Sequence, residues 1–238
     1  MEEKIFFIGF GKCGSTSFHM LMRKNKIISV HGGDVMEGWF INENYKKIKS
    51  RAQSYVYCDV MSPLNIDFVI SKFPESFYIL PSRNLIKWLI SVINHFNNCY
   101  NNYFKNVNYH NSYLKNVTGL DIYNILKIRN EYYKKIQQLT DDNKIKNFLF
   151  IDIEKDNIIE KLKNFLPKSF LKYYRKYPRA NKTCEDLVNN KIINNIIIRT
   201  FVYLEISEKD YESNWIIEIL NNNINHSELM KILPLENP

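Results

Sequence analysis

The stretch from Gly9 to Ser17, GFGKCGSTS, gathers residue types that together can hold a phosphate group. Glycine tolerates positive φ and close backbone approach, so successive N–H groups can converge on one anion. Lys12 adds a positive charge, and three hydroxyl donors follow the last glycine. The pattern predicts a phosphate-binding loop made by Gly11, Lys12, Cys13, Gly14, Ser15, Thr16 and Ser17.

The position of the lysine separates this loop from the ATP-binding P-loop, which is written G-x-x-x-x-G-K-[ST]. Counted from Gly9, the lysine of that pattern falls at position 15, where this chain has Ser15. Its own lysine comes earlier, at Lys12. A strand ending in a metal-binding aspartate has only a weak candidate, at Asp152. The pattern disfavours a P-loop kinase or NTPase, which stays open as an alternative.

A second cationic element follows the strand predicted at residues 76–82. Arg83 stands directly after that strand, and Ser91 lies within the helix predicted next, at residues 85–96. A guanidinium is planar and permanently charged, so it forms paired hydrogen bonds to phosphate. A serine hydroxyl can add a further short hydrogen bond. Arg83 and Ser91 therefore predict a second phosphate site.

Strands and helices alternate along the chain that positions these residues. Short apolar runs predict strands at residues 4–10, 27–33, 54–60, 76–82 and 147–153. Helical patterns and end signals predict helices at residues 15–25, 63–73, 85–96, 119–139 and 157–166, and a C-terminal one near 197–206. The alternation predicts a three-layer α/β fold, with a central parallel sheet flanked by helices.

No internal repeat and no Pro/Gly/Ser-rich linker interrupts the chain, so we expect one domain over residues 1–238. Residues 94–116 are rich in asparagine and tyrosine and have weak periodicity. That segment is interpreted as an acceptor-side loop or a helical insertion. Compositional drift in an asparagine-rich chain explains it equally well.

Both phosphate motifs resemble those of the sulfotransferases that use 3′-phosphoadenylyl sulfate (PAPS). The 5′-phosphosulfate loop of that family is written PK-x-G-[ST]-[ST] and here reads GKCGSTS, with Gly11 in place of the proline. The 3′-phosphate motif, R-[DN]-P-x-x-x-x-x-S, here reads RNLIKWLIS, with Leu85 in place of the proline. A weaker match, YPRANKT, resembles a P-x-x-N-x-[ST] segment near the nucleotide and adds Arg179 and Lys182 as candidates.

The resemblance runs over most of the chain and implies a P-loop sulfotransferase-like fold. It implies transfer of a sulfuryl group from PAPS to a hydroxyl or amine, with PAP (the desulfated donor) as product and no metal. Lys12 would neutralise the charge that develops on the bridging phosphate oxygen. Aromatic residues suited to stacking on a sugar favour a carbohydrate acceptor over other small molecules.

An acceptor hydroxyl also needs a general base. In the resembled family the base often stands at the end of the strand before the helix that leads to the arginine strand. Asp59 holds that position here, and a strand-end or helix-capping aspartate is the alternative interpretation. His31, near the end of the second predicted strand, is expected to line the acceptor pocket or to act as the base instead.

Composition limits the other function classes. The 238-residue chain carries a formal charge of +8, which favours anionic partners, but no single basic stripe predicts a nucleic-acid reader. The four scattered cysteines form no zinc motif, and they fit a reduced, cytoplasmic chain. No run approaches the roughly 18 apolar residues of a membrane span. A non-catalytic nucleotide-binding protein remains an alternative, and the oligomeric state stays open.

Overall fold

The computed structural model describes residues 4–31, 56–58, 63–98, 117–173, 176–178, 187–207 and 225–232. The chain divides into two compact units, each built from two separate segments. Unit 1 comprises Met1–Arg83 and Lys135–Lys182, and unit 2 comprises Asn84–Lys134 and Thr183–Pro238. The single domain expected over residues 1–238 stays a prediction.

A five-stranded sheet forms the centre of unit 1, with strand order β2-β3-β1-β4-β5. All its pairings are parallel. This arrangement confirms the central parallel sheet predicted from the sequence. The strands are β1 (Ile5–Phe7), β2 (Ser29–Val30), β3 (Val56–Cys58), β4 (Phe77–Ser82) and β5 (Asn147–Asp152).

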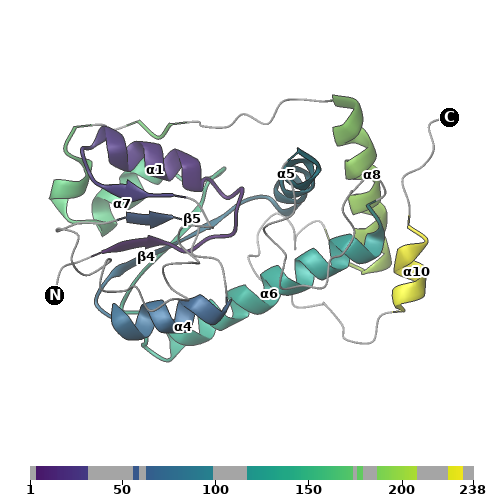
Figure 1. Cartoon of the computed structure of the whole chain (residues 1–238), viewed down its shortest axis with the longest axis horizontal. Coiled ribbons are helices and arrows are strands. Elements are labelled where there is room, and N and C mark those ends of the chain that lie inside the picture. The colour runs from purple at the N-terminus through teal and green to yellow at the C-terminus, as the bar shows by residue number, and fades with distance from the viewer. Residues whose placement is uncertain are drawn as a thin grey trace. The chain divides into compact units, whose positions relative to one another are not determined.

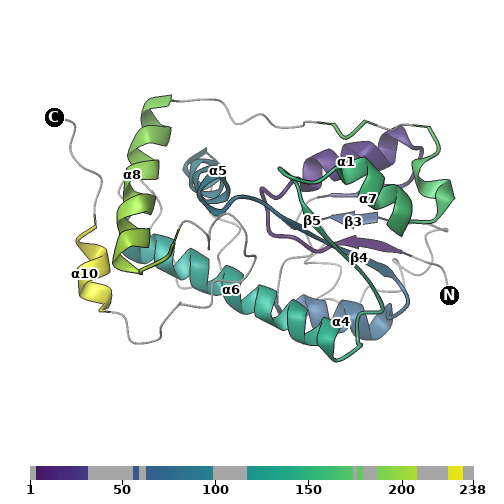
Figure 2. The same cartoon turned by 180° about the vertical axis from the view of Figure 1, so that it is seen from behind.

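Helices cover both faces of this sheet, which confirms the three-layer architecture. α1 (Ser15–Lys24) and α7 (Ile158–Phe165) lie on one face, and α4 (Pro63–Lys72) lies on the other (Figures 1 and 2). A short 3-10 helix, η2 (Lys168–Leu171), follows α7.

Strand β1 contributes side chains to the apolar layers on both faces of the sheet, because successive side chains on a strand point to opposite faces. Ile5 and Phe7 belong to a buried cluster with residues of α1 and α7. Phe6 points the other way and stacks on Tyr78 of β4, with ring centroids 5.3 Å apart. Because β1 is buried on both faces, its sequence is continuously apolar, as is typical of a central parallel strand.

Unit 2 is helical in its described part. α5 (Leu85–Asn98) packs against α8 (Leu187–Tyr203), and α10 (His226–Met230) lies near the C-terminus. α6 (Gly119–Asp141) begins in unit 2, and its residues from Lys135 onward belong to unit 1. The buried Arg129 of α6 stacks its guanidinium over the rings of Tyr133 and Trp88, at 4.4 Å and 5.1 Å from their centroids.

Most predicted elements are confirmed, with differences at their ends. The first strand is shorter than predicted, because the chain turns into the glycine loop. α8 begins at Leu187, well before the predicted start near residue 197, and α10 was not predicted. Within the segment 94–116, residues 94–98 extend α5, and the rest lies outside the described residues. None of the described helices is long and apolar enough to cross a membrane.

Candidate phosphate-binding site

The order of the strands defines where a ligand can bind in unit 1. From β1 the chain continues through α1 to β2 and β3 on one side of β1, whereas β4 and β5 lie on the other side. In open parallel sheets, ligands bind beyond the carboxyl ends of the strands at the point where the connections diverge. Here that point lies between β1 and β4. The glycine loop follows β1, and Arg83 follows β4.

The backbone of the glycine loop has the shape that its sequence predicts. A Cβ at Gly9 would collide with the ring of Pro81 on β4, so only glycine fits this crossing. The N–H of Cys13 donates to the carbonyl oxygen of Phe10 at 3.2 Å and closes a turn. Lys12 and Gly14 are both left-handed, with φ of 69° and 91°. Turns with left-handed residues direct successive N–H groups into a concavity that binds anions.

Helix α1 presents its N-terminal end directly behind this loop. Gly14 is the N-cap residue and has no side chain that could cap the helix. The first hydrogen bond of the helix runs from the Phe18 N–H to the Gly14 oxygen at 3.0 Å. The first turn contains no acidic residue, whereas the last turn contains Arg23 and Lys24. The positive end of the helix dipole therefore meets no carboxylate of its own first turn, which favours an anion there.

His31 lies against the hydroxyl groups of the predicted loop. Its Nε2 is 3.2 Å from the Oγ of Ser15 and 3.3 Å from the Oγ1 of Thr16. His19 of α1 approaches the His31 ring to 5.4 Å between centroids, and its Nδ1 is 2.8 Å from the Oγ of Ser29. A histidine in this place can orient both hydroxyls, as donor or as acceptor according to its tautomer.

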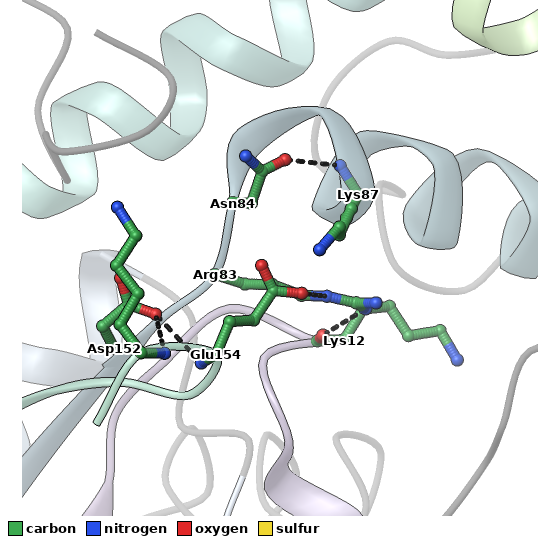
Figure 3. Close-up of polar contacts among 7 residues, drawn as sticks. Lys12, Arg83, Asn84, Lys87, Asp152 and Glu154 are labelled. Atoms are coloured by element: carbon green, nitrogen blue, oxygen red, sulfur yellow. Dashed lines mark hydrogen bonds and ion pairs between the residues drawn. The ribbon is translucent and has the colours of Figure 1, made fainter. Parts of the chain in front are cut away.

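Arg83 connects the second predicted motif to the first. Its Nη1 donates to the backbone oxygen of Lys12 at 3.4 Å, and its Nε lies 3.5 Å from Oε1 of Glu154 (Figure 3). The side chains of Arg83 and Glu154 are about one-quarter exposed, at 23% and 25%. Lys12 and Arg83 are 71 residues apart in the sequence, and this contact brings the two cationic motifs together.

A tight turn after β5 holds the backbone of Glu154. Oδ1 of Asp152 accepts hydrogen bonds from the N–H groups of Glu154 at 2.9 Å and Lys155 at 3.2 Å (Figure 3). Oδ2 of Asp156 accepts the N–H of Asp152 at 2.7 Å. The Asp152 carboxylate, the weak sequence candidate for a metal ligand, thus organises this turn. Within the described residues, no group of three or more His, Cys, Asp or Glu side chains is placed to hold a metal ion.

Two further residues of this site had little or no signal in the sequence. The hydroxyl of Tyr177 donates to the backbone oxygen of Gly14 at 3.1 Å, at the start of the weakly matching segment YPRANKT. Glu154 was missed. The signal that would have found it is its place just beyond a predicted strand, at the edge where parallel strands end.

The remaining predicted site residues lie in unit 2 or outside the described residues. Ser91 is buried in α5 and belongs to unit 2, whereas Arg83 ends a segment of unit 1, so their partnership stays a prediction. Asp59, Arg179 and Lys182 lie outside the described residues.

No protein-family model matches this chain, and no curated protein sequence matches it. Among solved structures, mouse sulfotransferase SULT7A1 complexed with PAP matches with a TM-score of 0.41 and 16% sequence identity. The match covers 95% of this chain and 74% of that chain. The three-layer α/β fold described above rests on the strand order and the layers of this chain itself.

Proposed function

We propose that this chain is a sulfotransferase that transfers a sulfuryl group from PAPS to a hydroxyl or amine of a carbohydrate or other small molecule. The observation that carries the proposal is the hydrogen bond from Arg83 to the backbone oxygen of Lys12. A donor with one phosphate at the ribose 5′ position and another at the ribose 3′ position needs two cationic sites close together. ATP has no 3′-phosphate, so it would give Arg83 no such role.

The residues of the glycine loop would hold the 5′-phosphate of the donor. PAPS supplies the sulfuryl group and leaves as PAP. The loop N–H groups and hydroxyls hold the phosphate in one position, and the Lys12 ammonium stabilises negative charge on its oxygens. Arg83 and Ser91 are proposed for the ribose phosphate. The remaining candidates for donor binding are Gly11, Cys13, Gly14, Ser15, Thr16, Ser17, Arg179 and Lys182.

Asp59 is the proposed general base, and His31 is the alternative. The contacts of His31 with Ser15 and Thr16 support a different role, in which the imidazole orients the loop hydroxyls for the phosphate. The proposal includes no metal, because Lys12 and the end of α1 supply positive charge at the phosphate. It also includes a cytoplasmic location, where scattered cysteines stay reduced.

The proposal is tested by thermal shift with PAP and, separately, with ATP plus Mg²⁺. A ligand at a hundred times its Kd adds about 2.7 kcal/mol to the stability of the protein that binds it. We expect PAP to raise the Tm of the wild type without Mg²⁺, and to raise it much less in Lys12→Ala and Arg83→Ala. Lys146→Ala is the matched control, because it also removes one charge, but at the amino end of β5.

Three results would overturn the proposal, each in a different way. Stabilisation by ATP with Mg²⁺ alone would leave a P-loop kinase or NTPase. Stabilisation by PAP that is equal in the wild type and in both site variants would mean that the nucleotide binds elsewhere. Stabilisation by PAP without transfer to any acceptor in a screen would leave a non-catalytic nucleotide-binding protein.

A further inference from the structure

The ion pair between Arg83 and Glu154 has features of a temporary contact. Oε1 of Glu154 lies 3.5 Å from Nε of Arg83, which is longer than a charge-assisted hydrogen bond of about 2.7–2.9 Å. A guanidinium carries more N–H donors than this pair and the bond to Lys12 engage, so it can take a second anionic partner. The Glu154 side chain is one-quarter exposed, which leaves it a route into solvent.

Glu154 lies where its carboxylate would compete with the phosphate that Arg83 is proposed to bind. Ile153, the residue before it, continues the pairing of β5 with β4 by donating to the oxygen of Ser82 at 3.0 Å. Glu154 therefore stands beside Arg83 at the carboxyl edge of the sheet. A carboxylate and a phosphate at the same guanidinium repel each other, and both are desolvated when a ligand covers them. The two anions compete for Arg83.

We propose that Glu154 is the counterion of Arg83 before the donor binds, and that the ribose phosphate of the donor displaces it. This inference rests on the proposed function. A phosphate with up to two negative charges is a stronger partner for a guanidinium than a carboxylate is. The turn at Asp152 holds the backbone of Glu154, so only its side chain has to move. Glu154 therefore lowers the affinity for a nucleotide that carries the 3′-phosphate, since a nucleotide without that phosphate leaves the ion pair in place.

The inference is tested by isothermal titration calorimetry with PAP and with AMP, which has the 5′-phosphate but lacks the 3′-phosphate. In Glu154→Gln the side chain keeps its size and loses its charge, so PAP no longer has to break an ion pair. Partly exposed pairs of this kind contribute up to about 1 kcal/mol, so we expect PAP to bind roughly two- to fivefold more tightly. We expect the affinity for AMP to stay the same.

Glu75→Gln is the matched control. Glu75, like Glu154, forms an ion pair. Its partner is Lys146, and the pair lies at the amino end of β4 and β5. Its substitution changes the net charge equally and should leave both affinities unchanged. Glu154→Gln in an Arg83→Ala background should give no gain, because the partner of the ion pair is then missing. Melting curves verify that each variant is folded.

The outcomes separate the inference from the proposed function. If the wild type prefers PAP to AMP but Glu154→Gln binds PAP equally or more weakly, the inference fails and the proposed donor stands. Weaker binding would mean that Glu154 holds Arg83 in its binding position. An equal gain in affinity for AMP and for PAP would mean that the substitution acts through the net charge of the protein, and it would also overturn the inference. A wild type that does not bind PAP would overturn both.

Discussion

Lys12 has a backbone conformation that its side chain does not favour. Its φ of 69° lies in the left-handed region, which costs a residue with a Cβ about 1–2 kcal/mol. Such residues persist where neighbouring groups hold them, and they cluster at functional sites. Here Arg83 donates to the Lys12 oxygen. The loop is therefore held by a contact from the same side chain that is proposed to bind the second phosphate.

The left-handed conformation of Lys12 predicts which of two variants at this position is the more stable protein. Lys12→Gly and Lys12→Ala both remove the ammonium, but only alanine keeps the strained Cβ. The left-handed cost of about 1–2 kcal/mol exceeds the extra entropy that glycine loses on folding, about 0.5–1 kcal/mol. We expect Lys12→Gly to be more stable than Lys12→Ala by roughly 0.5–1 kcal/mol in urea unfolding. The opposite order would contradict the left-handed loop.

At the residue scale, the sequence predicts residues whose types are needed to bind a phosphate. It does not predict backbone conformations and contacts that arise from tertiary packing. Gly14 could be predicted as left-handed, because glycine is the usual choice there. Lys12 could not, because a lysine carries no preference for that region. Glu154 was missed because a charged residue after a strand resembles an ordinary surface residue until its partner is known.

Strand β4 links helix α4, on one face of the sheet, to the candidate site at its own carboxyl end. The hydroxyl of Tyr78 donates to the backbone oxygen of Phe73 at 2.8 Å, just past the end of α4. Burial raises the pKa of Tyr78 far above its ordinary value near 10. The same strand ends at Ser82, directly before Arg83. The packing of α4 on β4 thus supports the strand that carries the arginine.

The raised pKa of Tyr78 predicts a loss of stability in alkaline solution. Above about pH 10 the unfolded chain loses the tyrosine proton that the folded chain keeps, so the free energy of unfolding falls as the pH rises. Tyr78→Phe should lower stability at pH 7 by about 1 kcal/mol and make this alkaline slope less steep. Urea unfolding between pH 7 and 11 measures both the loss at pH 7 and the alkaline slope. The exposed Tyr173→Phe is the control, and an equal slope in wild type and Tyr78→Phe would contradict the prediction.

Secondary structure was predicted well where the apolar pattern is strong and less well elsewhere. β1 and β4 are short apolar runs bounded by glycine or polar residues, and both were found. The start of α8 was predicted too late, because Leu187–Lys191 belongs to an asparagine-rich stretch with little apolar periodicity. α10 has only five residues, too few for a periodic signal.

At the scale of the whole molecule, the candidate site depends on which strands are neighbours. Lys12, Arg83, Glu154 and His31 all belong to unit 1. Lys12 and Arg83 meet because β4 lies directly beside β1. The alternation of strands and helices predicts a parallel sheet, but the order of its strands is set by tertiary packing. The sequence therefore indicates two phosphate motifs, and the fold supplies their proximity.

The affinity of Arg83→Ala for PAP and for AMP, measured by calorimetry beside the wild type, tests whether one site binds both phosphates. We expect the wild type to bind PAP more tightly than AMP. We expect Arg83→Ala to lose most of that preference, about 10-fold or more for a charged phosphate contact, and to keep its affinity for AMP. A preference for PAP that survives in Arg83→Ala would contradict the claim that Arg83 and the glycine loop form one donor site.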